Sequence, residues 1–296
     1  MKIETLHLEL LHACPLKCRA CDHRLMGGVR LSLKKLGPVF GSAAFKDLRT
    51  VSFSGGEPAL HPELCGILKA AALAFPAARL ILLSSLHCGA RLEKTLKALP
   101  PPILARLHIG SSLDGPGPVH DAMRGRAGAY ARLKAAHARI KNNFPQITTG
   151  FTFTATAANA AHFYNAWLAA RRELGAPLGV QFLVPNPNTA GLKLCAAGRK
   201  KLAEGLLQAV SDCLASGQAG LASGLLAALR FLRHKKTARS CGAGRSFVML
   251  SPEGSFYLCP FHKEITGPLS GLSTLRPALK GAALKTCAAC SLRCAQ

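Results

Sequence analysis

The sequence has no long hydrophobic run that is free of charge. Its most apolar stretch, residues 64–83, is interrupted by Lys69 and Arg79, and so does not resemble a membrane-spanning helix. The first apolar run contains Glu4 and Glu9 and follows no basic leader, which is not the pattern of a signal peptide. We therefore expect no membrane segment, and we expect the protein to reside in the cytoplasm.

Acidic side chains are scarce. There are 14 Asp and Glu residues against 38 Lys and Arg, and the formal net charge is +24. Such a charge attracts acidic partners, which include nucleic acid, an acidic peptide or an acidic electron carrier. The alternative is a solvated surface with no specific partner, because the basic residues are dispersed along the chain. Aromatic residues make up only 6% of the chain, so base stacking and nucleic-acid binding are not favoured.

Cysteine, by contrast, is abundant. The 296 residues include 12 cysteines, and 49% of the chain is hydrophobic, which is typical of a folded protein. Without an export signal, this many cysteines indicates metal binding rather than disulfides.

Short β-like runs alternate with helical-length segments along the first two thirds of the chain. This alternation predicts an α/β fold with a parallel sheet, and six units predict a partial (β/α)6 TIM-like barrel. In such a barrel the reactive loops follow the C-terminal ends of the strands. The predicted strands are Thr5–Leu11, Thr50–Ser54, Arg79–Ser85, Arg106–Ser112, Thr148–Ala155 and Gly179–Val184.

The pattern changes in the last third of the chain. A helical region precedes His234, and a cysteine-rich tail begins at Cys241, with a predicted hairpin turn at residues 251–254. We therefore expect two domains: the barrel in residues 1–234 and a small C-terminal cysteine-rich domain in residues 235–296.

Three cysteines follow the first predicted strand in the segment CPLKCRAC. Cys14, Cys18 and Cys21 have the spacing C-x3-C-x2-C. Thiolates are the usual ligands of iron–sulfur clusters, and a four-iron cluster on three thiolates keeps one iron open for chemistry. The alternative is a structural zinc site completed by His12 or His23.

A second motif ends the second predicted strand. Gly55 and Gly56 allow the backbone to approach a ligand closely, and the carboxylate of Glu57, before Pro58, can accept hydrogen bonds from an ammonium group. With the cysteine triad after the first strand, this GGEP segment resembles the radical S-adenosylmethionine (SAM) superfamily.

That resemblance implies a catalytic [4Fe-4S] cluster on the cysteine triad and SAM bound at GGEP, with Glu57 holding the methionine amino group. It also implies the reductive cleavage of SAM to a 5′-deoxyadenosyl radical, which abstracts hydrogen from the substrate. The electron donor would be an acidic flavodoxin or ferredoxin.

A third segment follows the fourth predicted strand. Ser112, Asp114 and Gly115 are followed by His120 and Arg124, a series that resembles the peptide-modifying branch of the superfamily. The resemblance implies that Ser112 lies near the ribose of SAM and Arg124 near its carboxylate. For His120 we expect a solvent-facing position at the start of a helix, and for Asp114-Gly115 the alternative is a plain turn.

Other loop residues have alternative roles. The third strand ends in Ser84-Ser85, which departs from the Asn-Gly ending more usual in the family. Asn186 and Asn188 either contact substrate or cofactor or cap their loop. The remaining cysteines are assigned to the core, with Cys88 also a candidate for the active site; they are Cys65, Cys88, Cys195 and Cys213.

The tail resembles the SPASM/twitch auxiliary-cluster domain. The resemblance implies a second, auxiliary [4Fe-4S] cluster on Cys241, Cys259, Cys287 and Cys290, with Cys294 as a spare or a replacement. The alternative is a zinc ribbon.

Together these patterns favour a radical SAM oxidoreductase that modifies a peptide or protein, of the ribosomal-peptide maturase type. Because the first strand begins almost at once, we expect any leader-peptide-binding domain to be a separate protein. The alternatives are a twitch-type dehydrogenase of a small alcohol or sugar, an RNA-modifying enzyme, and an electron-transfer or assembly protein. Electron transfer needs no ammonium-binding carboxylate, so Glu57 disfavours that last class.

Overall fold

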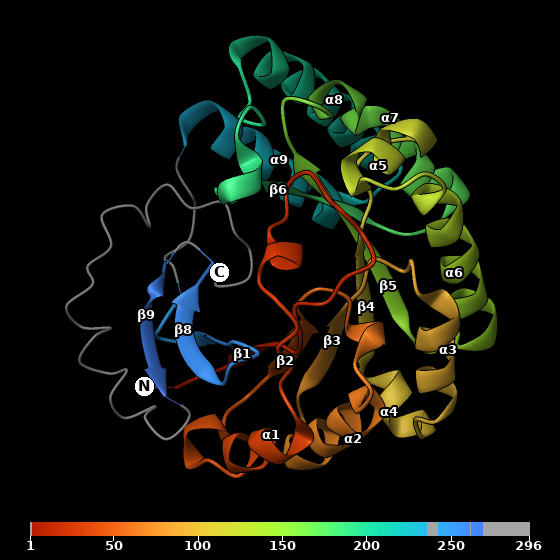
Figure 1. Cartoon of the computed structure of the whole chain (residues 1–296). Helices are drawn as coiled ribbons and strands as arrows, with labels where there is room; N and C mark the ends of the chain where they lie inside the picture. The colour runs from red at the N-terminus through yellow and green to blue at the C-terminus, as the bar shows by residue number, and fades with distance from the viewer. Residues whose placement is uncertain (1, 236–241, 261, 269–296) are drawn as a thin grey trace.

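The protein is described here by a computed structural model, which covers residues 2–235, 242–260 and 262–268. Within these residues, six parallel strands form a curved sheet with helices on its outer side (Figure 1). The predicted partial barrel is therefore confirmed. Its strands are β1 (Thr5–Glu9), β2 (Thr50–Ser54), β3 (Arg79–Leu83), β4 (Leu107–Ser112), β5 (Thr148–Ala155) and β6 (Leu178–Phe182).

Helices follow the strands and cover them from outside. A left-handed glycine, Gly217 at φ +68°, lies between the last two helices. The helices are α1 (Leu33–Phe40), α2 (Leu64–Ala74), α3 (Gly89–Lys97), α4 (Pro101–Ala105), α5 (Gly117–Arg124), α6 (Ala129–Asn143), α7 (Phe163–Leu168), α8 (Ala196–Ala215) and α9 (Ala219–His234). No helix in the described ranges is long and apolar enough to span a bilayer.

The sheet continues beyond β1 into the C-terminal part of the chain. Strand β7 (Phe247–Leu250) runs parallel to β1, and β8 (Ser255–Cys259) and β9 (His262–Pro268) add antiparallel strands. The predicted turn is present, with the amide of Gly254 donating to the carbonyl of Ser251 at 3.0 Å. The division into domains at residue 234 remains a prediction.

Alternating residues place a polar face inside the barrel. On β4, Leu107 and Ile109 are buried, whereas His108, Gly110 and Ser112 are half-buried on the other face. The helix side is the hydrophobic core, in which burying each large side chain contributes about 1.5–3 kcal/mol. The fold thus keeps polar side chains for the inner face, where a ligand can reach them.

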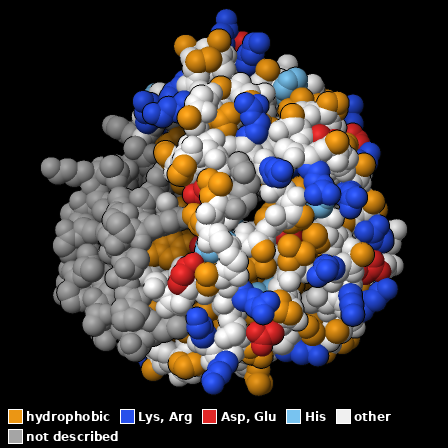
Figure 2. All heavy atoms as spheres, in the orientation of Figure 1, with side chains coloured by type: hydrophobic (Ala, Val, Ile, Leu, Met, Phe, Trp, Pro, Cys, Tyr) orange, Lys and Arg blue, Asp and Glu red, His pale blue; other side chains and the backbone are white. Residues whose placement is uncertain are grey.

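Basic side chains outnumber acidic ones on the visible surface. Figure 2 shows Lys and Arg side chains spread over the visible face, with few acidic ones among them. This matches the dispersed positive charge predicted from the sequence.

Candidate active site

The three predicted cluster ligands lie in the loop that follows β1, at the C-terminal edge of the sheet. Cys14, Cys18 and Cys21 are half-buried and free of disulfides. Burial raises the pKa of Cys14 to about 12 and also raises the pKa of Cys21. Thiolates at these positions therefore require a positive neighbour, such as a metal centre or a guanidinium group.

The cysteine loop rests on the glycines that end β2. The amide of Gly56 donates to the carbonyl of Leu11 at 2.7 Å, and the amide of Glu57 donates to the carbonyl of Ala13 at 2.9 Å. A Cβ atom on Gly56 would overlap the backbone carbonyls of Ala13 and His12. The second glycine is thus required sterically, because two backbone segments meet there.

Glu57 is completely buried, and the protein itself supplies its hydrogen-bond donors. One carboxylate oxygen accepts from the amide of Ala59 at 3.1 Å and from the hydroxyl of Ser84 at 2.8 Å. The other accepts from the amide of Ser85 at 2.9 Å and from the Ser85 hydroxyl. A carboxylate offers about four acceptor positions. Glu57 therefore connects the end of β2 to the β3–α3 loop through hydrogen bonds. An ammonium group that binds Glu57 would compete with these donors for the carboxylate oxygens.

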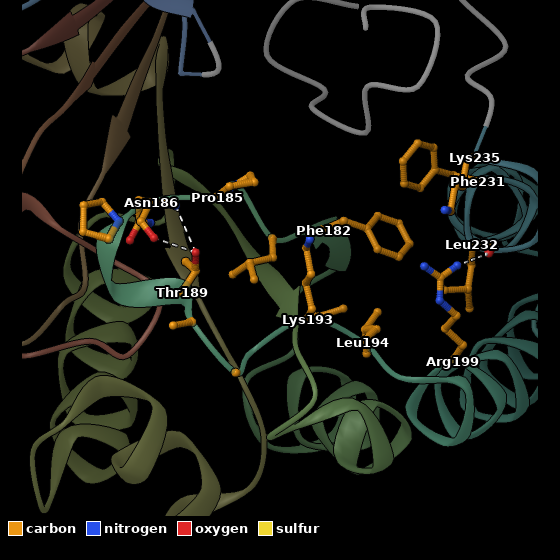
Figure 3. Close-up of a pocket in the computed structure, with 15 residues that line it drawn as sticks. Phe182, Pro185, Asn186, Thr189, Lys193, Leu194, Arg199, Phe231, Leu232 and Lys235 are labelled. Atoms are coloured by element: carbon orange, nitrogen blue, oxygen red, sulfur yellow. Dashed lines mark hydrogen bonds between the residues drawn. The ribbon is translucent and has the colours of Figure 1, made fainter.

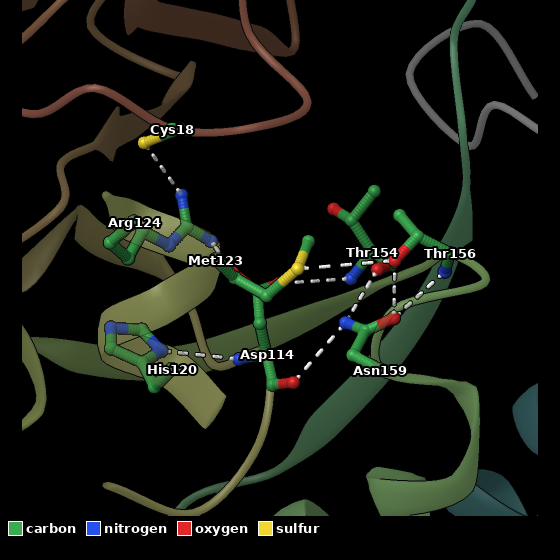
Figure 4. A network of polar contacts seen from close by, with 8 residues as sticks. All are labelled: Cys18, Asp114, His120, Met123, Arg124, Thr154, Thr156 and Asn159. Carbon is green, nitrogen blue, oxygen red and sulfur yellow. Dashed lines mark hydrogen bonds and ion pairs between the residues drawn. The ribbon is translucent and has the colours of Figure 1, made fainter. Parts of the chain in front are cut away.

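Arg124, at the end of α5, connects the cysteine loop to the end of β4 (Figure 4). Its Nη2 atom lies 2.5 Å from Oδ2 of Asp114, and its Nη1 atom lies 3.7 Å from Sγ of Cys18. Burial opposes the charge on Arg124, but Asp114 and Cys18 outweigh it, so the pKa of Arg124 is raised. A charged guanidinium is thus held beside one of the three thiols.

The expectation of a solvent-facing His120 is wrong. His120 is 2% exposed, and its Nδ1 atom accepts a hydrogen bond from the amide of Asp114 at 3.2 Å. Burial lowers the pKa of His120 to about 3, so the ring is neutral and can accept. Asp114-Gly115 is consequently more than a plain turn, because His120 and Arg124 both hold it.

Asn159 is a supporting residue that sequence reasoning missed. Its Nδ2 atom donates to the carbonyls of Asp114 at 3.2 Å and Thr154 at 3.0 Å (Figure 4). It is completely buried. Its position shortly after β5, on the same edge as the other site residues, was the available signal.

A cavity of about 180 Å³ opens beside the triad. Its walls include Cys18, Cys21, Asp114 and Arg124, together with inner-face residues of β5 and β6 such as Thr154. Two cysteines, a charged pair and polar strand residues therefore line one small space. Ser112 ends β4, half-buried on the inner face of that strand.

The loop after β6 also reaches the cysteine loop. Nδ2 of Asn186 donates to the carbonyl of Ala20 at 3.0 Å, and Nδ2 of Asn188 donates to the carbonyl of Cys21 at 2.5 Å. Asn186 also caps the short turn Pro187–Thr189. The capping role predicted for this loop is confirmed for Asn186, and both asparagines hold the backbone around the third cysteine.

The two histidines proposed as a fourth zinc ligand have other contacts. Nε2 of His12 lies 2.8 Å from the carboxylate of Glu253, and its Nδ1 atom lies 3.3 Å from Nδ1 of His23. Among the described residues, no group of three His, Cys, Asp or Glu side chains could hold a single metal ion.

The other cysteines differ in burial, and Cys65 is half-buried against the core. Cys213 is buried as predicted, whereas Cys195 is exposed and its core assignment is wrong, because it caps the start of α8. Cys88 is half-buried at the N-cap position of α3, where its side chain makes no capping hydrogen bond, and it lies near Glu57. Of the predicted auxiliary-cluster ligands, Cys259 is buried at the end of β8. The other four, Cys241, Cys287, Cys290 and Cys294, lie outside the described residues.

Comparison with known families identifies the class. The family described as the Radical SAM superfamily matches residues 8–159, which is more than half of the chain. The chain belongs to this superfamily, and membership implies a [4Fe-4S] cluster and SAM binding. The three thiols fit the cluster, because thiolates are cluster ligands. The backbone at Gly55 and Gly56, called the glycine shelf below, and the guanidinium of Arg124 fit SAM, because the guanidinium is a site for an anionic carboxylate.

Individual relatives add detail. A PqqA peptide cyclase from Ruegeria pomeroyi is 35% identical over 137 residues, covering 45% of this chain and 35% of the relative. The match thus covers about a third of the length of that curated relative. The solved structure of anSMEcpe with bound AdoMet has a TM-score of 0.64 at 15% identity, covering 87% of this chain and 74% of that one. Streptococcus suis SuiB bound to S-adenosylmethionine has a TM-score of 0.64 at 14% identity, covering 87% and 60%. At these identities both structures support the fold alone.

Proposed function

We propose that the protein is a radical SAM enzyme that modifies a peptide or protein. One observation carries the chemistry: backbone hydrogen bonds seat the cysteine loop on the Gly55–Gly56 shelf, beside the charged Arg124. Support for the substrate class comes from the similarity to PqqA peptide cyclase over 137 residues. SuiB, which shares the fold, has also been solved with its precursor peptide SuiA.

Each residue has a defined part in this proposal. Cys14, Cys18 and Cys21 would ligate the [4Fe-4S] cluster. When bound, the cluster and SAM supply a radical able to remove a hydrogen atom from a substrate C–H bond. Arg124 would neutralise the negative charge of the Cys18 thiolate and bind the SAM carboxylate.

Four further residues would shape the SAM site. Gly55 and Gly56 would keep the backbone open at the SAM amino group. Glu57, before Pro58, would hold the methionine amino group of SAM, and Ser112 would contact the ribose. These roles rest on the family resemblance and on the positions of the residues around one edge of the barrel.

The tail and the partners complete the proposal. Residues 235–296 would form the auxiliary-cluster domain, with Cys259 and the four tail cysteines as candidate ligands of a second [4Fe-4S] cluster. The electron donor would be a flavodoxin or ferredoxin, because an acidic protein suits a chain of net charge +24.

The test is isotope transfer with enzyme reconstituted anaerobically. Peptides made from deuterated amino acids are supplied with SAM and dithionite, and in parallel deuterated alcohols and sugars are supplied. Mass spectrometry then measures deuterium in 5′-deoxyadenosine, and a Cys14/Cys18/Cys21→Ala variant is the control. Transfer from a peptide supports the proposal, and transfer only from an alcohol or sugar contradicts it.

A further inference from the structure

A second, larger pocket lies next to the cavity at the cysteine triad. Its volume is about 550 Å³, within the usual range for binding sites. Leu183 lines both spaces, and Ala155 and Phe182, the last residues of β5 and β6, bring the pocket to the reactive edge of the barrel. The family match ends at residue 159, so most of this pocket lies beyond it.

The walls of this pocket are mainly apolar. The rings of Phe182 on β6 and Phe231 on α9 lie 4.8 Å apart and join the strand to the helix. Leu194 and Leu232 continue this surface (Figure 3). Apolar walls on both sides of a recess favour inserted side chains rather than a flat protein surface.

Three cations surround the apolar walls, and no lining residue is acidic. They are Lys193, Arg199 and Lys235, drawn around the pocket in Figure 3. Among the described residues, none of the three forms an ion pair. Lys193 and Lys235 are exposed, so their charges are available to a ligand.

No acidic side chain that the structure describes pairs with these cations. Residues 236–241, 261 and 269–296, which the structure does not describe, contain no Asp or Glu. The cations are therefore open to a counter-charge from a bound ligand.

The pocket is also connected to the cysteine loop. Asn186 lines the pocket, and its side chain donates to the carbonyl of Ala20, next to the third cysteine of the triad. A peptide segment bound in this pocket would therefore lie directly beside the cavity at the cysteine triad.

We propose that this pocket binds a segment of the substrate peptide that combines acidic and apolar side chains. The apolar side chains would lie against Phe182 and Phe231, and the carboxylates would pair with Lys193, Arg199 and Lys235. This inference rests on the proposed function and specifies the substrate that the site selects.

The test measures peptide binding by fluorescence anisotropy with the reconstituted full-length enzyme. The probe is a short fluorescein-labelled peptide of repeating Glu-Leu-Ser, compared with Gln-Leu-Ser and Glu-Ser-Ser repeats. The variant Lys193→Glu/Lys235→Asp reverses two pocket charges. The control, Lys34→Glu/Lys35→Asp, makes the same change in net charge at exposed positions of α1.

The Glu-Leu-Ser probe should bind at least about tenfold more weakly to the pocket variant, and no more than about twofold more weakly to the control. The other two probes should bind the wild type more weakly than Glu-Leu-Ser. Equal losses in both variants, or equal binding of all three probes, would overturn the proposal. So would a pocket variant that loses binding of flavodoxin but keeps the peptide, because the cations would then serve the donor.

Binding is read without turnover, so its outcome is independent of the isotope-transfer test. If peptides donate deuterium but the pocket variant binds the probe normally, the pocket assignment fails and the proposed function stands. If no peptide donates deuterium, the proposed function fails whatever the binding result.

Discussion

The guanidinium group of Arg124 forms a buried ion pair with Asp114, with 2.5 Å between Nη2 and Oδ2. The same guanidinium reaches the thiol of Cys18 at 3.7 Å. One side chain therefore couples the end of β4 to the cysteine loop, and the charge proposed to bind the SAM carboxylate is held by the fold itself.

Breaking this ion pair should destabilise the protein strongly. Asp114→Asn leaves the buried Arg124 without its counter-charge, which costs about 3–5 kcal/mol in the free energy of unfolding. Anaerobic denaturant titration measures the loss. The double variant Asp114→Asn/Arg124→Gln removes both charges, so it should lose less than the sum of the two single variants. Additive losses would show that the pair is not coupled.

The glycine shelf should be essential for cluster binding. Gly56→Ala places a Cβ against the carbonyls of Ala13 and His12, so the cysteine loop must shift. We expect this variant to retain much less iron after reconstitution, measured as iron and sulfide per chain. Gly28→Ala is the control, because a Cβ there meets nothing within 4 Å. Equal iron in the two variants would refute the steric argument.

Glu57 should affect both stability and SAM binding. Glu57→Gln places an amide NH2 group among the donors from Ser84, Ser85 and Ala59, which costs about 1–3 kcal/mol in unfolding free energy. If Glu57 also binds the SAM ammonium group, SAM affinity should fall by at least about tenfold. Ser85→Ala removes a competing donor and should preserve SAM affinity in equilibrium binding. If the SAM affinity of Glu57→Gln equals that of the wild type, Glu57 has a structural role only.

Buried histidines should make the protein sensitive to acid. Burial lowers the pKa of His120 to about 3 and of His137 to about 4. Below pH 6.5 the histidines of the unfolded chain take up protons, whereas the buried histidines of the folded protein do not. The free energy of unfolding therefore decreases as the pH is lowered. The loss is about 1.4 kcal/mol per pH unit for each histidine, until the pH reaches the folded-state pKa.

Unfolding titrations at pH 7 and pH 5 check this dependence. His137→Gln should reduce the stability difference between these pH values by about 2 kcal/mol. The exposed residue His234 provides the control, and His234→Gln should leave the difference as it is in the wild type. The same pH dependence in His137→Gln as in the wild type would contradict the burial argument.

The sequence predicted features that local patterns encode. The strands and the cysteine loop follow from periodicity, and the turn after β7 follows from Pro and Gly. The contacts that it missed join residues far apart in the chain. Asn159 donates to the carbonyl of Asp114, and β7 pairs with β1 across most of the sequence.

Ser84 and Ser85 show the same limit. In the sequence they are only a departure from a family pattern, yet their hydroxyl groups donate to Glu57. His120 was misplaced because its polar ring gave no sign that it accepts a buried amide hydrogen. Such side-chain contacts depend on which strands lie next to each other in the folded sheet, and local sequence patterns do not encode that arrangement.

The most direct test of the central claim is SAM cleavage by the anaerobically reconstituted protein. We predict that the wild type forms 5′-deoxyadenosine from SAM and dithionite, whereas the Cys14/Cys18/Cys21→Ala variant, folded by circular dichroism, forms none. Formation of 5′-deoxyadenosine by the variant, or no cleavage by an iron-loaded wild type, would contradict the assignment of the triad as the catalytic cluster site.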